Sequence, residues 1–146
     1  MWTITGFADE ISKDLDEQIE LLSKLGIKFV EFRSAWGTKV LDLSQEQLIL
    51  AKSKLDQAGI RVSSVGSDLG KIFINEPFEA HLERTRHGVD VAKFFGAKYI
   101  RMFSFFIPEG QNPDDFRDEV MSRTKKMVEL AEAGGVTQLH ENEKDV

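Results

Sequence analysis

Two glutamates near the end of the printed sequence, Glu141 and Glu143, have the type and spacing that could do chemistry. They follow the run "GGVTQLH", whose β-forming residues predict a strand that ends beside them. Carboxylates in such a place can transfer protons as general acids or bases, and their oxygens suit hard divalent metals. The stretch therefore indicates a functional strand end, and the elements before it must explain how that end is positioned.

The three histidines give little support for a metal site of their own. Their spacing matches neither HExxH nor another metal-binding motif, so any metal site has to depend on carboxylates. His81 and His87 fall within an expected helix, and we expect both at its surface. Strand alternation turns His140 away from Glu141, as a packed or exposed residue. Cysteine is absent, which excludes disulfides and thiolate chemistry.

The composition is that of a globular protein. Its 146 residues are 41% hydrophobic and 30% charged, and we expect a single domain over residues 1–146. The net charge of −6, without a basic stripe, argues against binding to nucleic acid or to a membrane surface. We find no stretch apolar enough for a membrane span and no secretory signal pattern. The absence of cysteine fits a reducing cytoplasm, and we expect a cytoplasmic protein.

Four segments share a pattern of a helix end, a glycine and a β-forming run. The segments are 24–34, 57–67, 94–104 and 132–142, with glycines at 26, 59, 96 and 134. The glycines lie about 35 residues apart, which fits one helix and one strand per repeat. Glycine after a helix is the usual left-handed cap, so each of these positions is expected to end a helix.

Four amphipathic helices and a first strand complete the pattern. We expect helices over 12–25, 44–58, 79–95 and 113–133 and a strand over 3–8. Ser12 is the expected N-cap of the first helix, and Ser44 with Gln47 forms a capping box for the second. Alternation of strands and helices with short loops predicts a parallel sheet with right-handed crossovers.

The expected strands carry charges at alternate positions. In the second expected strand, Glu31 and Arg33 share one face and Val30 and Phe32 share the other. In the fourth, Arg101 lies on the face opposite to Ile100 and Met102. Apolar side chains toward helices and charges on the opposite face fit a barrel, and no Gly-rich phosphate loop supports a doubly wound sheet. We therefore predict an α/β fold, a partial (β/α)8 TIM barrel with about four βα units plus a fifth parallel strand. Structural ion pairs of Glu31, Arg33 and Arg101 are an alternative explanation of these charges.

The stretches "GFADEIS", "GIKFVEFRS", "SVGSDLGKI" and "GVTQLHENEKD" resemble, in order and spacing, the sugar phosphate isomerase/epimerase family. That family consists of xylose isomerase-like TIM barrels and includes endonuclease IV-like members. The resemblance extends over essentially the whole chain. Because a complete barrel has eight βα units in about 250 residues, it implies that the chain is an N-terminal portion: a truncated form, a fragment or a natural short product.

The resemblance also implies a metal. Glu141, followed by Asn142, matches the Glu-Asn pair at the end of strand five in the family, which makes Glu141 the first metal ligand and a candidate catalytic residue. Glu143 is a second candidate. An Asp, a His and a Glu from later strands would complete the site beyond Val146. A divalent metal (Mn, Mg, Co or Zn) is implied for the full-length parent, and we expect none bound here, because a hard cation takes about six oxygens.

The implied reaction is proton transfer next to the carbonyl of a small sugar or sugar phosphate, by carboxylates on opposite faces of an enediolate. Further residues at expected strand ends are candidates for binding that substrate: Arg33, Asp68, Lys71, Arg101 and Ser104. Asp9, Glu10 and Ser67 occupy similar places.

Each of these candidates also has a simpler interpretation. Asp68 and Ser104 can cap turns through their side-chain oxygens, and Lys71 can be a solvated surface charge. Trp36 and the run "MFSFF" (102–106) could wall a sugar site, or they could be packing residues.

An incomplete barrel leaves strand edges and an apolar inner face uncovered. We therefore expect a homodimer or a larger assembly that pairs these edges, with a local rearrangement of the chain as the alternative. Three functions stay open: a fragment of a sugar isomerase/epimerase that is inactive alone, a non-catalytic half-barrel that self-associates, and an endonuclease IV-like hydrolase. The acidic composition argues against the third.

Overall fold

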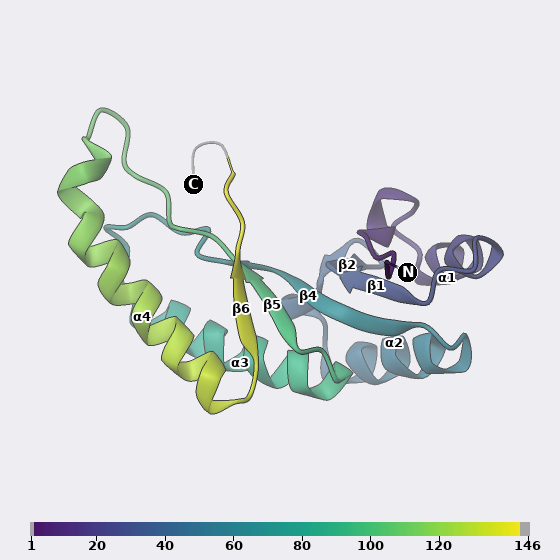
Figure 1. Cartoon of the computed structure of the whole chain (residues 1–146). Helices are drawn as coiled ribbons and strands as arrows, with labels where there is room; N and C mark the ends of the chain where they lie inside the picture. Colours follow the sequence, from purple (N-terminus) through teal and green to yellow (C-terminus); the bar gives the residue numbers. More distant parts are fainter. Residues whose placement is uncertain (1, 144–146) are drawn as a thin grey trace.

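The computed structural model describes residues 2–143 and consists of a parallel four-stranded sheet with helices along one side (Figure 1). The strand order is β1-β4-β5-β6. These strands are β1 (Phe29–Phe32), β4 (Arg61–Leu69), β5 (Tyr99–Met102) and β6 (Thr137–His140). The helices are α1 (Leu15–Lys24), α2 (Gln45–Gln57), α3 (Glu79–Phe95) and α4 (Arg117–Ala133). The last residues of the motif "GVTQLHENEKD", Lys144 and Asp145, lie outside the described residues.

Four expected helices are present, with changes at two of their starts. The predicted capping box holds α2: the Ser44 hydroxyl accepts from the Gln47 backbone, and the Gln47 side chain accepts from the Ser44 backbone. Helix α1 begins later than predicted, because Asp14 and not Ser12 accepts from the first free backbone N–H groups. Residues Pro113–Phe116 form a 3-10 turn before α4 begins.

The predicted strand over residues 3–8 is wrong. Only one backbone hydrogen bond joins this segment to β1 within the described chain, from Glu31 N–H to Gly6 C=O at 2.9 Å. The Thr5 hydroxyl contacts the Ser63 hydroxyl at 2.7 Å, and the chain then turns into a 3-10 helix at Ala8–Glu10. A ladder needs repeated bonds, so the segment flanks the sheet without becoming a regular strand.

A short hairpin after β1 was not predicted. Its strands are β2 (Ser34–Ala35) and β3 (Thr38–Lys39), which pair antiparallel. The turn between them has positive φ at Trp36 (54°) and Gly37 (73°), as a type I′ turn requires. The Trp36 N–H donates to the Lys13 carbonyl, and the side chain packs against the core. Tryptophan is unusual at such a position, which is why the turn gave little signal in the sequence.

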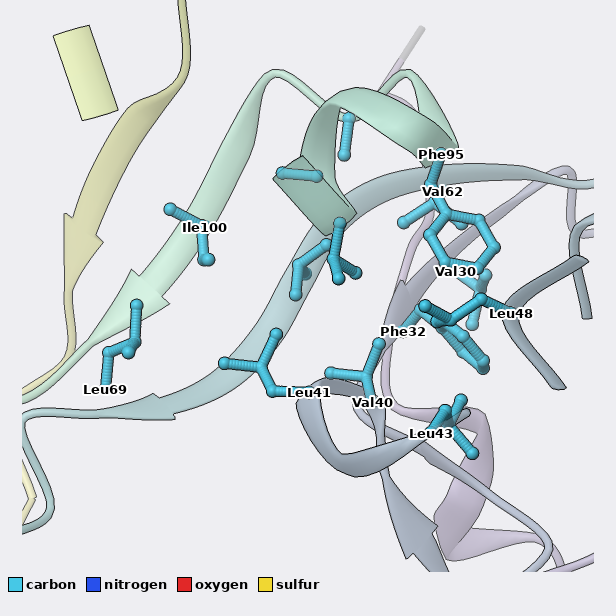
Figure 2. Packing of buried hydrophobic residues seen from close by; sticks show 14 of the residues in the cluster. Val30, Phe32, Val40, Leu41, Leu43, Leu48, Val62, Leu69, Phe95 and Ile100 are labelled. Atoms are coloured by element: carbon cyan, nitrogen blue, oxygen red, sulfur yellow. The ribbon is translucent and has the colours of Figure 1, made fainter. Parts of the chain in front are cut away.

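The core lies between the sheet and the helices, on the face predicted from strand alternation. Val30 and Phe32 are buried there, opposite the charged face of β1. Phe32 meets Phe95 of α3 edge to face, with ring centroids 5.1 Å apart. Figure 2 shows these side chains together with Leu48 of α2 and Ile100 of β5 in one buried cluster. None of the described helices is long and apolar enough to cross a membrane.

The last of the four expected glycine caps is placed one residue too early. Gly134 has φ −84°, and the left-handed residue is Gly135 with φ 73°. Gly134 is needed for close packing instead, because a Cβ on it would lie 2.3 Å from a methyl carbon of Val89. Helix α4 therefore ends against α3 through a residue without a side chain.

The prediction for the histidines of α3 is correct for His87, which is exposed, and wrong for His81, which is buried. His81 shares a stripe at helical spacing with Thr85, Gly88 and Ala92, and this stripe packs toward the sheet. Histidine is a polar residue that is more often exposed than fully buried, so residue type alone favours the surface.

Gly70, just after β4, should tolerate no side chain. It has φ +90°, and an added Cβ would lie 2.0 Å from the Phe103 carbonyl oxygen. Gly59 is a matched control, because its φ is +66° and the space around its Cβ position is open. We expect Gly59→Ala to lower the free energy of unfolding by about 1–2 kcal/mol, from the left-handed backbone alone. Gly70→Ala should cost roughly 4 kcal/mol or more, since backbone atoms must also move. Urea midpoints at unchanged slope measure both, and equal losses would contradict the predicted clash.

Candidate functional site

A cavity of about 350 Å³ lies at the carboxyl ends of the strands. All four strands are parallel, so the residues that follow them meet at one edge of the sheet. Of the seven site residues proposed from the sequence, six line this cavity: Arg33, Asp68, Lys71, Arg101, Glu141 and Glu143. The structure thus brings together residues from all four strand ends, although these residues lie far apart in the sequence.

Arg101 of β5 binds Glu141, which directly follows β6. Its Nη1 lies 3.1 Å from the Glu141 Oε2, and its Nε donates to the Ser67 carbonyl at 3.1 Å. The Ser67 hydroxyl in turn donates to the Arg101 carbonyl. The Arg101 side chain is only 14% exposed, and its guanidinium stacks on the rings of Phe7 and Phe103, 5.1 and 4.8 Å from their centroids.

An irregularity in β4 makes this arrangement possible. Between β4 and β5 the register passes from Val65↔Ile100 to Leu69↔Met102, so β4 carries two more residues than its partner over this span. Carbonyls in the bulged span are free from the ladder, and the Arg101 guanidinium supplies their donors. The bulge therefore orients the end of β4 toward the cavity.

Arg33, which follows β1, forms the second charged cluster with the 3-10 turn that precedes α1. Its Nε donates to Asp9 Oδ2 at 2.8 Å, and the same oxygen accepts from the Ser34 hydroxyl at 2.7 Å. Glu10 also binds the guanidinium. The hydrogen bond to Asp9 is the main cause that raises the pKa of Arg33, so it is charged at all ordinary pH values.

Asp9 is nearly buried, with its side chain 9% exposed. Its Oδ1 is buried and has no hydrogen-bond partner among the described residues. The interior charges are thus ion pairs for Arg33 and Arg101, as the alternative interpretation proposed. Within residues 2–143, Glu31 has no such partner.

Asp68, near the end of β4, is held by two cations from different elements. Lys39 of the hairpin binds its Oδ2 at 2.9 Å, and Arg84 of α3 binds its Oδ1 at 2.9 Å. Burial alone would raise the pKa of Asp68, but the hydrogen bonds from Lys39 and Arg84 outweigh it and lower the pKa. Asp68 is therefore a fixed carboxylate with cations on both oxygens, and its role is larger than the turn cap considered from the sequence.

Lys71 and Glu143 form a further ion pair across the cavity. The Lys71 ammonium also lies 4.2 Å from the centroid of the Phe103 ring, within the range of a cation–π contact. Lys71 is thus partly enclosed and has two partners, which a freely solvated surface lysine lacks.

Ser104 is the proposed site residue that the structure leaves out of the cavity. Its hydroxyl contacts Nε2 of His140, which lies on the edge strand β6 and is exposed. Trp36 packs on the core at the hairpin turn, and Phe103 and Phe105 of the aromatic run are buried. Of this aromatic run, only Phe103 contacts charged cavity residues: its ring lies below the ammonium of Lys71 and the guanidinium of Arg101.

Several cavity residues were not proposed from the sequence. Phe7 packs closely against Gly66: a Cβ on Gly66 would lie 3.1 Å from the Phe7 ring and 3.0 Å from Cβ of Arg33. Ser34 and Lys39 reach the cavity through the unpredicted hairpin. The turn pair Trp36-Gly37 between two alternating stretches was the one available signal for them.

The described residues do not by themselves fit a divalent metal. Residues 2–143 contain no group of three or more His, Cys, Asp or Glu side chains that could hold one. Glu141 and Glu143 line the cavity, but each is bonded to a cation. What this part of the chain offers a ligand is a balanced set of charged donors and acceptors: Arg33, Lys39, Lys71 and Arg101 opposite Asp9, Asp68, Glu141 and Glu143. Such a set suits a polyhydroxylated molecule, which both donates and accepts hydrogen bonds.

Comparison with known proteins places this fold. Among solved structures, a xylose isomerase-like TIM barrel protein from Mycobacterium smegmatis in complex with magnesium matches at TM-score 0.76 and 18% identity, over 99% of this chain and 56% of that one. A D-tagatose 3-epimerase-like protein matches at TM-score 0.75 and 17% identity, over 97% of this chain and 55% of that one. A 3-keto-D-glucoside 4-epimerase from E. coli matches at TM-score 0.70 and 15% identity, over 97% and 56%.

The chain therefore spans about half the length of these structures. The predicted α/β fold, a part of a TIM barrel, is confirmed by them and by the parallel sheet. A search of curated proteins found no match. The family model described as xylose isomerase-like TIM barrel matches residues 19–145, and the chain belongs to that family.

Proposed function

We propose that this chain forms the N-terminal part of a sugar or sugar phosphate isomerase/epimerase, which moves a proton next to the sugar carbonyl. The observation that carries the proposal is the carboxylate of Glu141, held by Arg101 at the mouth of a polar cavity where parallel strands end. Barrel enzymes place their chemistry at this end of the strands. The sugar epimerase names of two structural neighbours support the same substrate class.

In this proposal the cavity residues divide into two roles. Glu141 faces the reacting carbons, with Glu143 as a second carboxylate, while Arg33, Asp68, Lys71 and Arg101 bind the hydroxyl or phosphate oxygens of the sugar. Salt bridges and stacking hold each of these side chains in place before a ligand arrives, which limits the entropy lost on binding. Ser104 is not part of the proposal, since it lies outside the cavity.

We further propose that the metal belongs to a longer protein. Glu141 would be the first ligand of Mn, Mg, Co or Zn, and its remaining ligands would come from outside residues 1–146. The magnesium named with the M. smegmatis neighbour supports a divalent metal in the family. Residues 1–146 alone are proposed to be inactive, because proton exchange on two faces of an enediolate needs groups on both sides of the substrate.

A non-catalytic half-barrel that self-associates is the second candidate function, and the sheet itself favours it. Strand β6 pairs only with β5, so one edge of the described sheet is open. Tyr99 and Leu139 are exposed on neighbouring strands. We therefore propose a homodimer or larger assembly that covers β6. A cytoplasmic location and a single domain over residues 1–146 stay predictions.

Binding of D-fructose and D-fructose 6-phosphate to residues 1–146 tests the proposed cavity. We expect amide shifts in ¹⁵N–¹H spectra around Ser34, Ser67 and Lys71. Glu141→Gln should weaken binding by about tenfold, since the charged bond that holds Arg101 in the cavity is lost. Glu132→Gln, an exposed change on α4, is the matched control and should bind as the unchanged chain does. Shifts confined to another face, or equal losses in the two variants, would overturn the assignment.

Calorimetry with Mn²⁺ and Mg²⁺ tests the incomplete metal site. We expect no micromolar binding to residues 1–146, because Arg101 occupies Glu141 and the described residues supply few other oxygen ligands. With either metal added, the same sample should show no exchange of the proton beside the ketose carbonyl in D₂O. Micromolar affinity that Glu141→Gln abolishes would sink this prediction.

Sedimentation tests the proposed self-association. The chain should sediment as a dimer or larger species at micromolar concentration, and Leu139→Lys should shift it to the monomer by placing a charge on the edge strand. Leu50→Lys on α2 is the control, because Leu50 is 47% exposed and Leu139 44% exposed. A compact monomer for the unchanged chain at all concentrations would rule the assembly out.

A further inference from the structure

The turn after β4 carries two residues of the cavity and is held from behind by helix α3. It runs from Asp68 to Lys71, and the Lys71 N–H donates to the Asp68 carbonyl at 3.0 Å. From the first turn of α3, Nε2 of His81 accepts the Gly70 N–H at 2.8 Å. One helical turn further on, Arg84 binds the Asp68 carboxylate. The helix therefore holds this turn at two points, one through the backbone and one through a cavity side chain.

Contacts on the opposite side leave the turn little room to move. The Phe103 N–H donates to the Leu69 carbonyl at 2.7 Å, and the Phe103 carbonyl lies against the Gly70 Cα. Gly70 is thus enclosed between the segment after β5 and the imidazole of His81. Gly70 directly precedes Lys71, whose side chain lines the cavity.

The acceptor role of His81 requires a neutral ring. An imidazole whose Nε2 accepts a hydrogen bond carries its proton on Nδ1, whereas an imidazolium would direct an N–H at the Gly70 N–H. The side chain is well enclosed, since the residue is 6% exposed and the rings of Phe78 and Phe105 lie 6.3 and 6.2 Å away.

The charged groups around His81 favour the neutral ring on balance. Burial is the main cause that lowers the pKa of His81, and the nearby Arg84 lowers it further. Asp68 opposes Arg84 with a somewhat smaller effect, Arg123 of α4 lowers the pKa of His81 again, and Glu76 opposes it with the smallest effect. The imidazole is therefore neutral near pH 7, and its lowered pKa means that it becomes charged only below the ordinary histidine pKa of about 6.5.

We propose that His81 is a positioning residue for the cavity: its neutral imidazole holds the Gly70 amide and thereby sets the positions of Asp68 and Lys71 for a ligand. Protonation of His81, or loss of its acceptor atom, releases the turn and weakens ligand binding. The inference rests on the proposed function of the cavity, but the bond between His81 and Gly70 exists independently of it. No residue of the cavity itself has to titrate for this effect.

Three variants separate the acceptor atom from the packing of the ring. His81→Gln keeps an acceptor that does not titrate, and His81→Phe keeps a ring of similar size but leaves the Gly70 N–H without a partner. His87→Gln, on the exposed side of the same helix, is the control. At pH 7.5, we expect His81→Gln to bind D-fructose 6-phosphate nearly as the unchanged chain does. His81→Phe should bind it roughly tenfold more weakly.

The pH dependence has a definite sign. Because the folded pKa of His81 is lowered, the folded chain resists a proton that the unfolded chain accepts. Stability is therefore full above the ordinary pKa of histidine, about 6.5, and is lost as the pH falls from there toward the folded pKa. Ligand binding should weaken only at the lower pH at which the folded ring itself titrates. In His81→Gln, the loss of stability and the weakening of ligand binding at lower pH should both be absent. In His87→Gln, both should remain.

The decisive measurement follows the Gly70 and Lys71 amides and the His81 ring nitrogens by ¹⁵N NMR between pH 7.5 and 4.5, with and without D-fructose 6-phosphate. We expect the two amides to shift together with the His81 ring, and the affinity for the sugar phosphate to fall with them. Amides that shift without any sugar binding at either pH would refute the proposed function and leave the anchoring by His81 intact. Binding that stays constant while His81 titrates, or that is equal in His81→Phe and His81→Gln, would refute the positioning role.

Discussion

The guanidinium of Arg101 joins the carboxyl ends of three strands, and the site depends on this one group. It binds the carboxylate that follows β6 and donates to backbone carbonyls of the bulge in β4, while its own backbone lies in β5. A buried guanidinium needs acceptors in several directions, and the bulge and Glu141 provide them. The same bond that satisfies the arginine thus fixes the glutamate at the cavity. An Arg101 without Glu141 would leave a largely enclosed charge unpaired, so the two residues stabilise one arrangement of the three strand ends.

Much of the fold can be predicted from the sequence, because strand alternation and helix caps depend on residues that are close together in the chain. The alternation of Val30 and Phe32 with Glu31 and Arg33 shows which face of β1 meets the helices, and the Ser44 capping box marks the start of α2. Of the charged residues on the predicted strand faces, Arg33 and Arg101 line the cavity, whereas Glu31 does not. Their partners could not be deduced in the same way. Whether Arg101 binds Glu141 depends on the register of two strands separated by a whole helix.

The residues missed by sequence reasoning are those placed by irregular backbone. The β4 bulge with Gly66 and the hairpin with a left-handed Trp36, which carries Ser34 and Lys39, have no periodic pattern, and these three residues line the cavity. His81 was assigned to the surface for a related reason. Helical spacing places it on the buried stripe with Thr85, Gly88 and Ala92, but residue type alone favours an exposed histidine. Its actual partner is a backbone amide in a turn, which no side-chain pattern reveals.

The ion pairs of the cavity differ in exposure, and this difference determines which of them a ligand can displace most easily. The pair of Arg33 with Asp9 and the pair of Arg101 with Glu141 each contain a nearly enclosed partner, so separating them would leave a desolvated charge. The Lys39 side chain is 64% exposed, and an ion pair of this kind contributes about 0–1 kcal/mol. Exchange of such a contact for a ligand oxygen therefore costs little. A polyhydroxylated ligand would displace the outer lysine contacts first and then meet the inner pairs as a rigid surface of donors and acceptors. Selectivity among ligands would come from that inner surface, because its geometry is set by the strands and not by the ligand.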